Sequence, residues 1–73
     1  MENELKYEMI GIKAVVETDI SLTNNFIQIT ENLAEKQPSI YFDGLLFGLQ
    51  ECLRLLDDLK DRINNILEES GKE

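Results

Sequence analysis

The sequence predicts an all-α protein: an antiparallel hairpin of two long helices that dimerises into a four-helix bundle. Apolar residues recur at steps of three and four along both halves of the chain, which is the spacing of a helix face. The single proline, Pro38, separates the two halves. The apolar stripes are wider than one neighbouring helix can cover, which predicts a second hairpin.

A first helix is expected over about residues 3–35, within one domain that spans residues 1–73. Its main apolar positions are Leu5, Ile12, Val15, Leu22, Phe26, Ile29 and Leu33. Met9, Val16, Ile20, Ile27 and Ala34 widen this arc to one side. Short polar and β-branched residues at positions 18–25 compete with helical geometry, so a kink near Asp19 is the alternative to one continuous helix.

The joint is expected at residues 36–38, because Pro38 cannot lie inside a helix and disfavours helix for the residue before it. Ser39 offers a side-chain oxygen as the N-cap of a second helix over about residues 39–69, and Pro38 at the first helical position is the alternative start. Gly71 is a natural helix stop. So short a joint predicts antiparallel neighbours.

The second helix carries the more regular stripe, with Leu46, Leu53 and Leu67 along one flank and Tyr41 and Leu55 along the other. The stripe itself consists of Phe42, Leu45, Leu49, Cys52, Leu56, Leu59, Ile63 and Ile66. From this helix we expect a self-association core of Leu45, Leu49, Cys52, Leu53, Leu55, Leu56, Leu59, Ile63 and Ile66. A partner of this kind is needed because a chain of this length buries only roughly 60% of its unfolded surface.

Two other remedies for a small core are missing, since one cysteine cannot form an internal disulfide and the chain has no histidine. The predicted outline is similar to that of the plasmid-copy-control hairpin proteins, which dimerise into four-helix bundles. The basic face that their RNA binding requires is absent from this sequence, so no family is assigned.

Fifteen acidic and seven basic residues give a net charge of -8, which argues against binding to nucleic acid or to an anionic membrane surface. The first residues include Glu2, Glu4 and Glu8 and do not resemble a signal peptide. No apolar run approaches the ~20 residues of a membrane span. A cytoplasmic protein is therefore expected.

The densest carboxylates, Asp57, Asp58 and Asp61, fall on the outer face of the second helix, where Arg54 and Arg62 lie within reach of Asp58. Their pattern is that of a solvated helix face rather than of a Mg²⁺ or Ca²⁺ site. The paired acidic motifs of the all-α nucleotide pyrophosphohydrolases are also absent. No catalytic residue, metal ligand or cofactor is expected.

Two residues on the stripes, Cys52 and Asp19, need a separate interpretation. Cys52 is interpreted as a buried packing residue, because no histidine is present to activate its thiolate. Asp19 occupies a position that should be apolar. Asp19 either sets the register of a bundle at a cost in stability, or faces water where the helix bends.

The joint-proximal end of the second helix is the candidate partner patch, and it consists of Tyr41, Phe42, Gly44, Phe47 and Gly48. Gly44 and Gly48 each cost about 1 kcal/mol in a helix and either permit a close approach or loosen the first turns. Phe47 lies on an otherwise polar face and is either shielded by the joint or offered to a partner.

These features predict a small acidic protein-interaction module that works without catalysis as a regulator, inhibitor or adaptor. Its partners are a second copy of itself and another protein of basic character. One alternative is a structural subunit that completes a larger helical assembly. Another is a mimic of DNA that occludes a nucleic-acid-binding protein, and a third is a carboxylate metalloenzyme.

Overall fold

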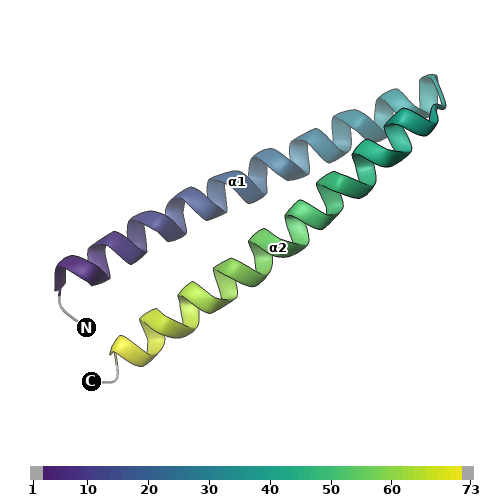
Figure 1. The fold of residues 1–73 in the computed structure, drawn as a ribbon. Coiled ribbons are helices and arrows are strands. Elements are labelled where there is room, and N and C mark those ends of the chain that lie inside the picture. Colours follow the sequence, from purple (N-terminus) through teal and green to yellow (C-terminus); the bar gives the residue numbers. More distant parts are fainter. Residues whose placement is uncertain (1–2, 72–73) are drawn as a thin grey trace.

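The computed structural model describes the backbone of residues 3–71 and the side chains of residues 3–69. It contains two helices, α1 (Asn3–Lys36) and α2 (Ile40–Gly71), and the predicted all-α hairpin is confirmed. The helices run antiparallel from a short loop, as Figure 1 shows. Their Cα atoms span 54 × 14 × 13 Å, so the hairpin is a thin rod.

Helix α1 runs without a break through positions 18–25, so the alternative of a kink near Asp19 is not observed. Threonine hydroxyls in this region bond back to the preceding turn. The Thr18 Oγ1 donates to the Ala14 carbonyl oxygen at 2.9 Å, and the Thr23 Oγ1 donates to the Asp19 carbonyl oxygen at 2.7 Å. Their hydrogen-bonding capacity is thus used within the helix instead of competing with it.

The loop ends α1 and starts α2 with few residues. The Gln37 N–H donates to the Leu33 carbonyl oxygen at 2.9 Å and closes the last turn of α1. The Tyr41 N–H donates to the Ser39 Oγ at 3.1 Å, and the Asp43 N–H donates to the Ser39 carbonyl oxygen at 3.2 Å. Ser39 is therefore the N-cap of α2, one of the two starts that the sequence predicted.

The two helices meet along an inner seam of half-buried and buried residues, again at alternating steps of three and four. On α1 the inner seam is Met9, Lys13, Val16, Ile20, Thr23, Ile27, Thr30 and Ala34. On α2 it is Phe42, Leu46, Leu49, Leu53, Leu56, Lys60, Ile63 and Leu67. We call two residues level when they lie equally far from the loop along the rod. Each seam residue of α1 is level with one of α2, for example Ile20 with Leu56.

The stripes expected from the sequence are therefore rotated relative to the observed seam. All the main apolar positions predicted for the first helix, from Leu5 to Leu33, are exposed, and the residues assigned to its flank face α2 instead. On α2 only alternate members of the predicted stripe face α1. On α1, polar residues in the true seam, such as Lys13 and Thr23, made the neighbouring stripe the more regular of the two, although that stripe contains Asp19.

The core of this rod is small. Among the described side chains the buried apolar residues are Val16, Ile27 and Ile63, with Val16 5% and Ile63 3% exposed. Half-buried Lys13 and Lys60 lie in the seam at the levels of Ile63 and Val16, where the aliphatic part of a lysine can cover apolar surface while its ammonium group stays in water. Within the described chain neither helix is long and apolar enough to cross a membrane.

Candidate functional site

A second set of apolar side chains lies outside the inner seam, one residue before each seam position. We call this set the apolar face. On α1 it comprises Leu5, Ile12, Val15, Leu22, Phe26, Ile29 and Leu33, and on α2 Leu45, Cys52, Leu55, Leu59 and Ile66. All of these residues are exposed in the hairpin, and Phe26 and Leu55 are each 58% exposed.

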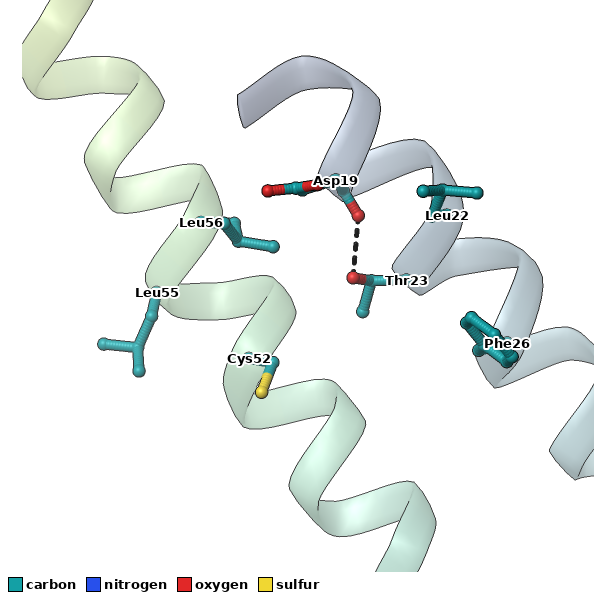
Figure 2. Close-up of a pocket in the computed structure, with 7 residues that line it drawn as sticks. All are labelled: Asp19, Leu22, Thr23, Phe26, Cys52, Leu55 and Leu56. Carbon is teal, nitrogen blue, oxygen red and sulfur yellow. Dashed lines mark hydrogen bonds between the residues drawn. The ribbon is translucent and has the colours of Figure 1, made fainter. Parts of the chain in front are cut away.

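The apolar positions of both helices fall on one side of the hairpin. A step back of one residue turns a helix by about 100°, and the same step on two antiparallel helices leads to the same side of their plane. An open groove of about 430 Å³ lies across this side and draws its lining from both helices, as Figure 2 shows. Its lining residues are Asp19, Leu22, Thr23, Phe26, Cys52, Leu55 and Leu56.

The opposite side of the hairpin is mostly polar. It is formed by the residues that follow the seam positions, and on α1 these include Glu17, Asn24 and Glu31. On α2 the corresponding exposed residues include Asp43, Gln50 and Asp57. The molecule is therefore one-sided, with apolar surface along both helices on one side and mostly polar, acidic surface on the other.

Three charged residues and one glycine interrupt the apolar face. Glu8 lies toward the N-terminal end of α1, and Asp19 lines the groove with Leu55 and Leu56 near the middle of the rod. Arg62 lies at the outer edge of the face, where its Nη2 is 3.2 Å from the Asp58 Oδ2 and its side chain is 75% exposed. At Gly48 an added Cβ would meet no atom of the hairpin within 4 Å.

The structure divides the predicted self-association core between the two surfaces. Leu49, Leu53, Leu56 and Ile63 face α1 in the inner seam. The apolar face contains the other members, Leu45, Cys52, Leu55, Leu59 and Ile66. Cys52 is exposed in the single chain, so the burial predicted for it as a packing residue is not observed within the hairpin.

The sequence-based list of site residues omitted the α1 half of the apolar face. Val15, Leu22, Phe26 and Ile29 were predicted as main apolar positions of the first helix but not as site residues, and they are exposed beside the α2 residues of the face. The signal that could have identified them is the unbroken step pattern from Ile12 to Leu33, in which Asp19 is the one charged residue. An aspartate is more readily accepted on an exposed face than in a hairpin's only seam.

The candidate partner patch is also divided. Phe42 is half-buried at the loop end of the inner seam, and its ring meets that of Tyr41 edge to face at 6.0 Å. Gly48 belongs to the apolar face. Tyr41 and Phe47 are exposed, and Phe47 lies with Gly44 on the outer side of α2.

Ile40 joins this outer surface and was not among the predicted site residues. It is 90% exposed, and it lies one turn before Gly44 and two turns before Phe47 on α2. We call Ile40, Tyr41, Gly44 and Phe47 the loop-end patch. An added Cβ at Gly44 would meet nothing within 4 Å, so the glycine leaves a gap between two exposed apolar side chains.

Two carboxylates of α2, Glu51 and Asp58, form surface ion pairs. Arg62 pairs with Asp58 as expected, while Arg54 pairs with Glu51 at 3.0 Å and not with Asp58. On α1 Lys13 and Glu17 are 3.9 Å apart. Within the described residues no three histidine, cysteine, aspartate or glutamate side chains are grouped as a metal site would require.

Comparisons with models of protein families, with curated proteins and with solved structures find no match to this chain.

Proposed function

We propose that this chain is a protein-interaction module of the cytoplasm that pairs with a second copy through its apolar face and acts on another protein as a regulator, inhibitor or adaptor, without catalysis. The single observation that carries the proposal is the one-sidedness of the hairpin. Exposed apolar residues run along both helices on one side, and mostly polar residues cover the other, where Ile10 and Phe47 are exposed apolar exceptions. A continuous apolar surface of this length marks an association site.

A second copy is the occupant that fits this face. The face is nearly as long as the rod, and a second hairpin has the same length, the same width and the same apolar surface. Two hairpins packed face to face would bury both apolar faces in the centre of a four-helix bundle. The polar sides would remain in water.

The apolar area is sufficient for such a dimer. Each large apolar side chain of the face is about half exposed, and burying the rest of it would contribute about half of the roughly 1.5–3 kcal/mol of full burial. Summed over the eleven large side chains of one protomer's face, the gain is roughly 8–16 kcal/mol. The gain from both protomers exceeds the ~4–15 kcal/mol that association costs.

A dimer leaves a surface for another protein. The loop-end patch points away from the apolar face, apart from Tyr41 at its edge, and exposes apolar surface near Asp43 and Glu51. An apolar side chain of the partner would fill the gap at Gly44 between Ile40 and Phe47. The net charge of -8 per chain favours a basic partner.

Solution mass measured by light scattering over a range of concentrations, with circular dichroism on the same samples, tests the dimer. We expect a strongly helical species with twice the chain mass of 8.4 kDa. A helical monomer at high concentration would contradict the proposal. A monomer of weak helicity would instead support the alternative of a structural subunit, in which a different chain of a larger helical assembly covers the apolar face.

The partner role is tested by affinity capture with the wild-type chain and with a Phe47→Gln variant. A single recovered protein that binds the wild type and is lost with Phe47→Gln supports the loop-end patch. Equal recovery by both chains contradicts the patch. Recovery of a nucleic-acid-binding protein that is lost in moderate salt regardless of Phe47 would favour the DNA mimic.

A further inference from the structure

We propose that the two hairpins of the dimer pack with their loops at the same end, because this arrangement places Asp19 of each protomer beside Arg62 of the other. The inference rests on the dimer proposed above and adds its geometry. Face-to-face packing of two hairpins with two-fold symmetry has two solutions. The loops lie at the same end of the bundle or at opposite ends.

The two solutions pair different helices. With the loops at the same end, α1 of one copy lies over α2 of the other. Residues of the two copies that are equally far from their loops then face each other. With the loops at opposite ends, α1 lies over α1 and α2 over α2. A residue near the loop of one copy then faces residues far from the loop of the other copy, and only the middle of the rod faces itself. Both solutions bury the same apolar residues, so the charged residues of the face distinguish them.

With the loops at opposite ends, the two copies of Asp19 approach each other. Asp19 lies near the middle of α1, so reversing the levels places its copy about one turn away on the facing helix. Arg62 lies on α2 at the outer edge of the face and remains on the far side of the bundle. Two carboxylates would enter an apolar interface without a cation in reach, which is strongly unfavourable.

With the loops at the same end, each Asp19 meets a cation. The α2 helix of the second copy runs over α1 at the same level, and Arg62 lies between one and two turns from Asp19 along the rod. Side chains lean toward the N-terminus of their helix, and α1 and the facing α2 run in opposite directions. The two side chains therefore lean toward each other, and a long arginine reaches the carboxylate.

Within one hairpin this pair does not form. Arg62 forms an ion pair with Asp58 on its own helix at 3.2 Å, and its side chain is 75% exposed. The Asp19 carboxylate points toward α2 over the groove in Figure 2. The charge complementarity of Asp19 and Arg62 is thus available to a second copy and fits one of the two arrangements.

The same arrangement pairs large residues with small ones near the loop. Counted from the loop, Gly48 of one copy lies within one residue of the level of Ile29 of the other, and Cys52 lies between the levels of Leu22 and Phe26. The glycine makes room for the isoleucine, because nothing in its own hairpin lies within 4 Å of the position of a Cβ. Phe26 would cover the Cys52 side chain.

Spin labels measure the arrangement directly by the distance between the two copies. A label at Gln37→Cys in a Cys52→Ser background reports the separation of the loops, and a label at Ser21→Cys, near the middle of the rod, is the control. We expect a Gln37 distance of roughly 15–30 Å, since packed helix axes are about 8–10 Å apart. Opposite loops would give a distance close to the rod length of 54 Å and overturn the inference.

The control separates this inference from the dimer itself. A dipolar signal from Ser21 together with a long Gln37 distance would support the dimer and contradict the same-end arrangement. The absence of a dipolar signal from both labels would contradict the dimer and therefore also the arrangement.

A charge exchange gives an independent test. We expect Asp19→Lys and Arg62→Glu each to raise the dimer Kd about tenfold or more, and the double variant to recover most of that loss. The Asp58 contact is common to both Arg62→Glu chains and cancels in the comparison. Additive effects of the two substitutions would overturn the pairing.

Discussion

Leu55 and Leu56 are adjacent in the sequence and serve different surfaces. Leu56 points toward α1 and is half-buried in the inner seam, whereas Leu55 points away from α1 and is 58% exposed on the apolar face (Figure 2). One residue of offset along both helices thus separates the contact that makes the hairpin from the surface proposed to make the dimer. The two contacts can be changed independently.

Leu55→Glu should dissociate the dimer, because it places a carboxylate in the middle of the apolar face without a cation opposite it. We expect the dimer Kd to rise at least a hundredfold, in line with an unpaired charge in an interface. Light scattering or analytical ultracentrifugation measures the change. Gln50→Glu is the matched control, since Gln50 is exposed on the polar side of the same helix. Equal loss in both variants would contradict the assignment of the face.

Gly44→Ala and Gly48→Ala should have different effects although both glycines are helical and have open space at the Cβ position. Alanine is favoured over glycine in a helix by about 1 kcal/mol. We expect Gly44→Ala to raise the Tm by roughly 4–8 °C, as such a gain does in a domain of this size. Circular dichroism during heating measures it.

Gly48→Ala gains the same helix propensity but adds a methyl group to the apolar face opposite Ile29 of the second copy. We expect a weaker dimer and a smaller rise of the Tm than with Gly44→Ala. The two variants differ only in the side of α2 that they change. A Gly48→Ala dimer tighter than the wild type would show that no close approach occurs there.

Ser39→Ala should destabilise the start of α2, because the Ser39 Oγ accepts a hydrogen bond from the Tyr41 N–H at 3.1 Å. Loss of an N-cap costs about 1 kcal/mol, and urea unfolding followed by circular dichroism measures the free energy of unfolding. Ser39→Asp should keep the cap and the stability. Ser21→Ala, in the middle of α1, is the second control and should not lower the stability.

Thr30→Val should leave the stability of the hairpin within about 0.5 kcal/mol of the wild type. Thr30 is 5% exposed, and its Oγ1 donates at 2.7 Å to the Phe26 carbonyl oxygen, a group that lies within the helical hydrogen-bond ladder. Valine retains the shape and removes the hydroxyl together with its need for a partner. Thr30→Ala removes the buried methyl group as well, and we expect a loss of about 1 kcal/mol in urea unfolding. Equal losses in both variants would show that the hydroxyl itself stabilises the seam.

Much of the fold follows from local patterns in the sequence. Pro38 and Ser39 define where one helix ends and the next begins, and apolar residues at steps of three and four define both helices. The excess of apolar surface over what a single hairpin buries is equally visible, because it depends only on the width of each stripe. The polar segment at positions 18–25 was ambiguous, since threonine hydroxyls either compete with a helix or bond back into it.

The sequence by itself determined the two helices, the joint and the excess of apolar surface. Only the tertiary structure decided which stripe of each helix packs against the other helix and which stripe stays exposed. Each helix has two neighbouring stripes one residue apart. On α1 a count of apolar residues favours the stripe without lysine and threonine, and on α2 the predicted stripe alternates between the two. In the hairpin the short loop turns Ala34 and Phe42 toward each other, and the seam continues from that contact. Lys13 and Lys60 fit this seam because a lysine can lay its aliphatic stem along a neighbour and keep its charge in water. That choice depends on packing between distant parts of the chain, which a one-dimensional pattern does not contain.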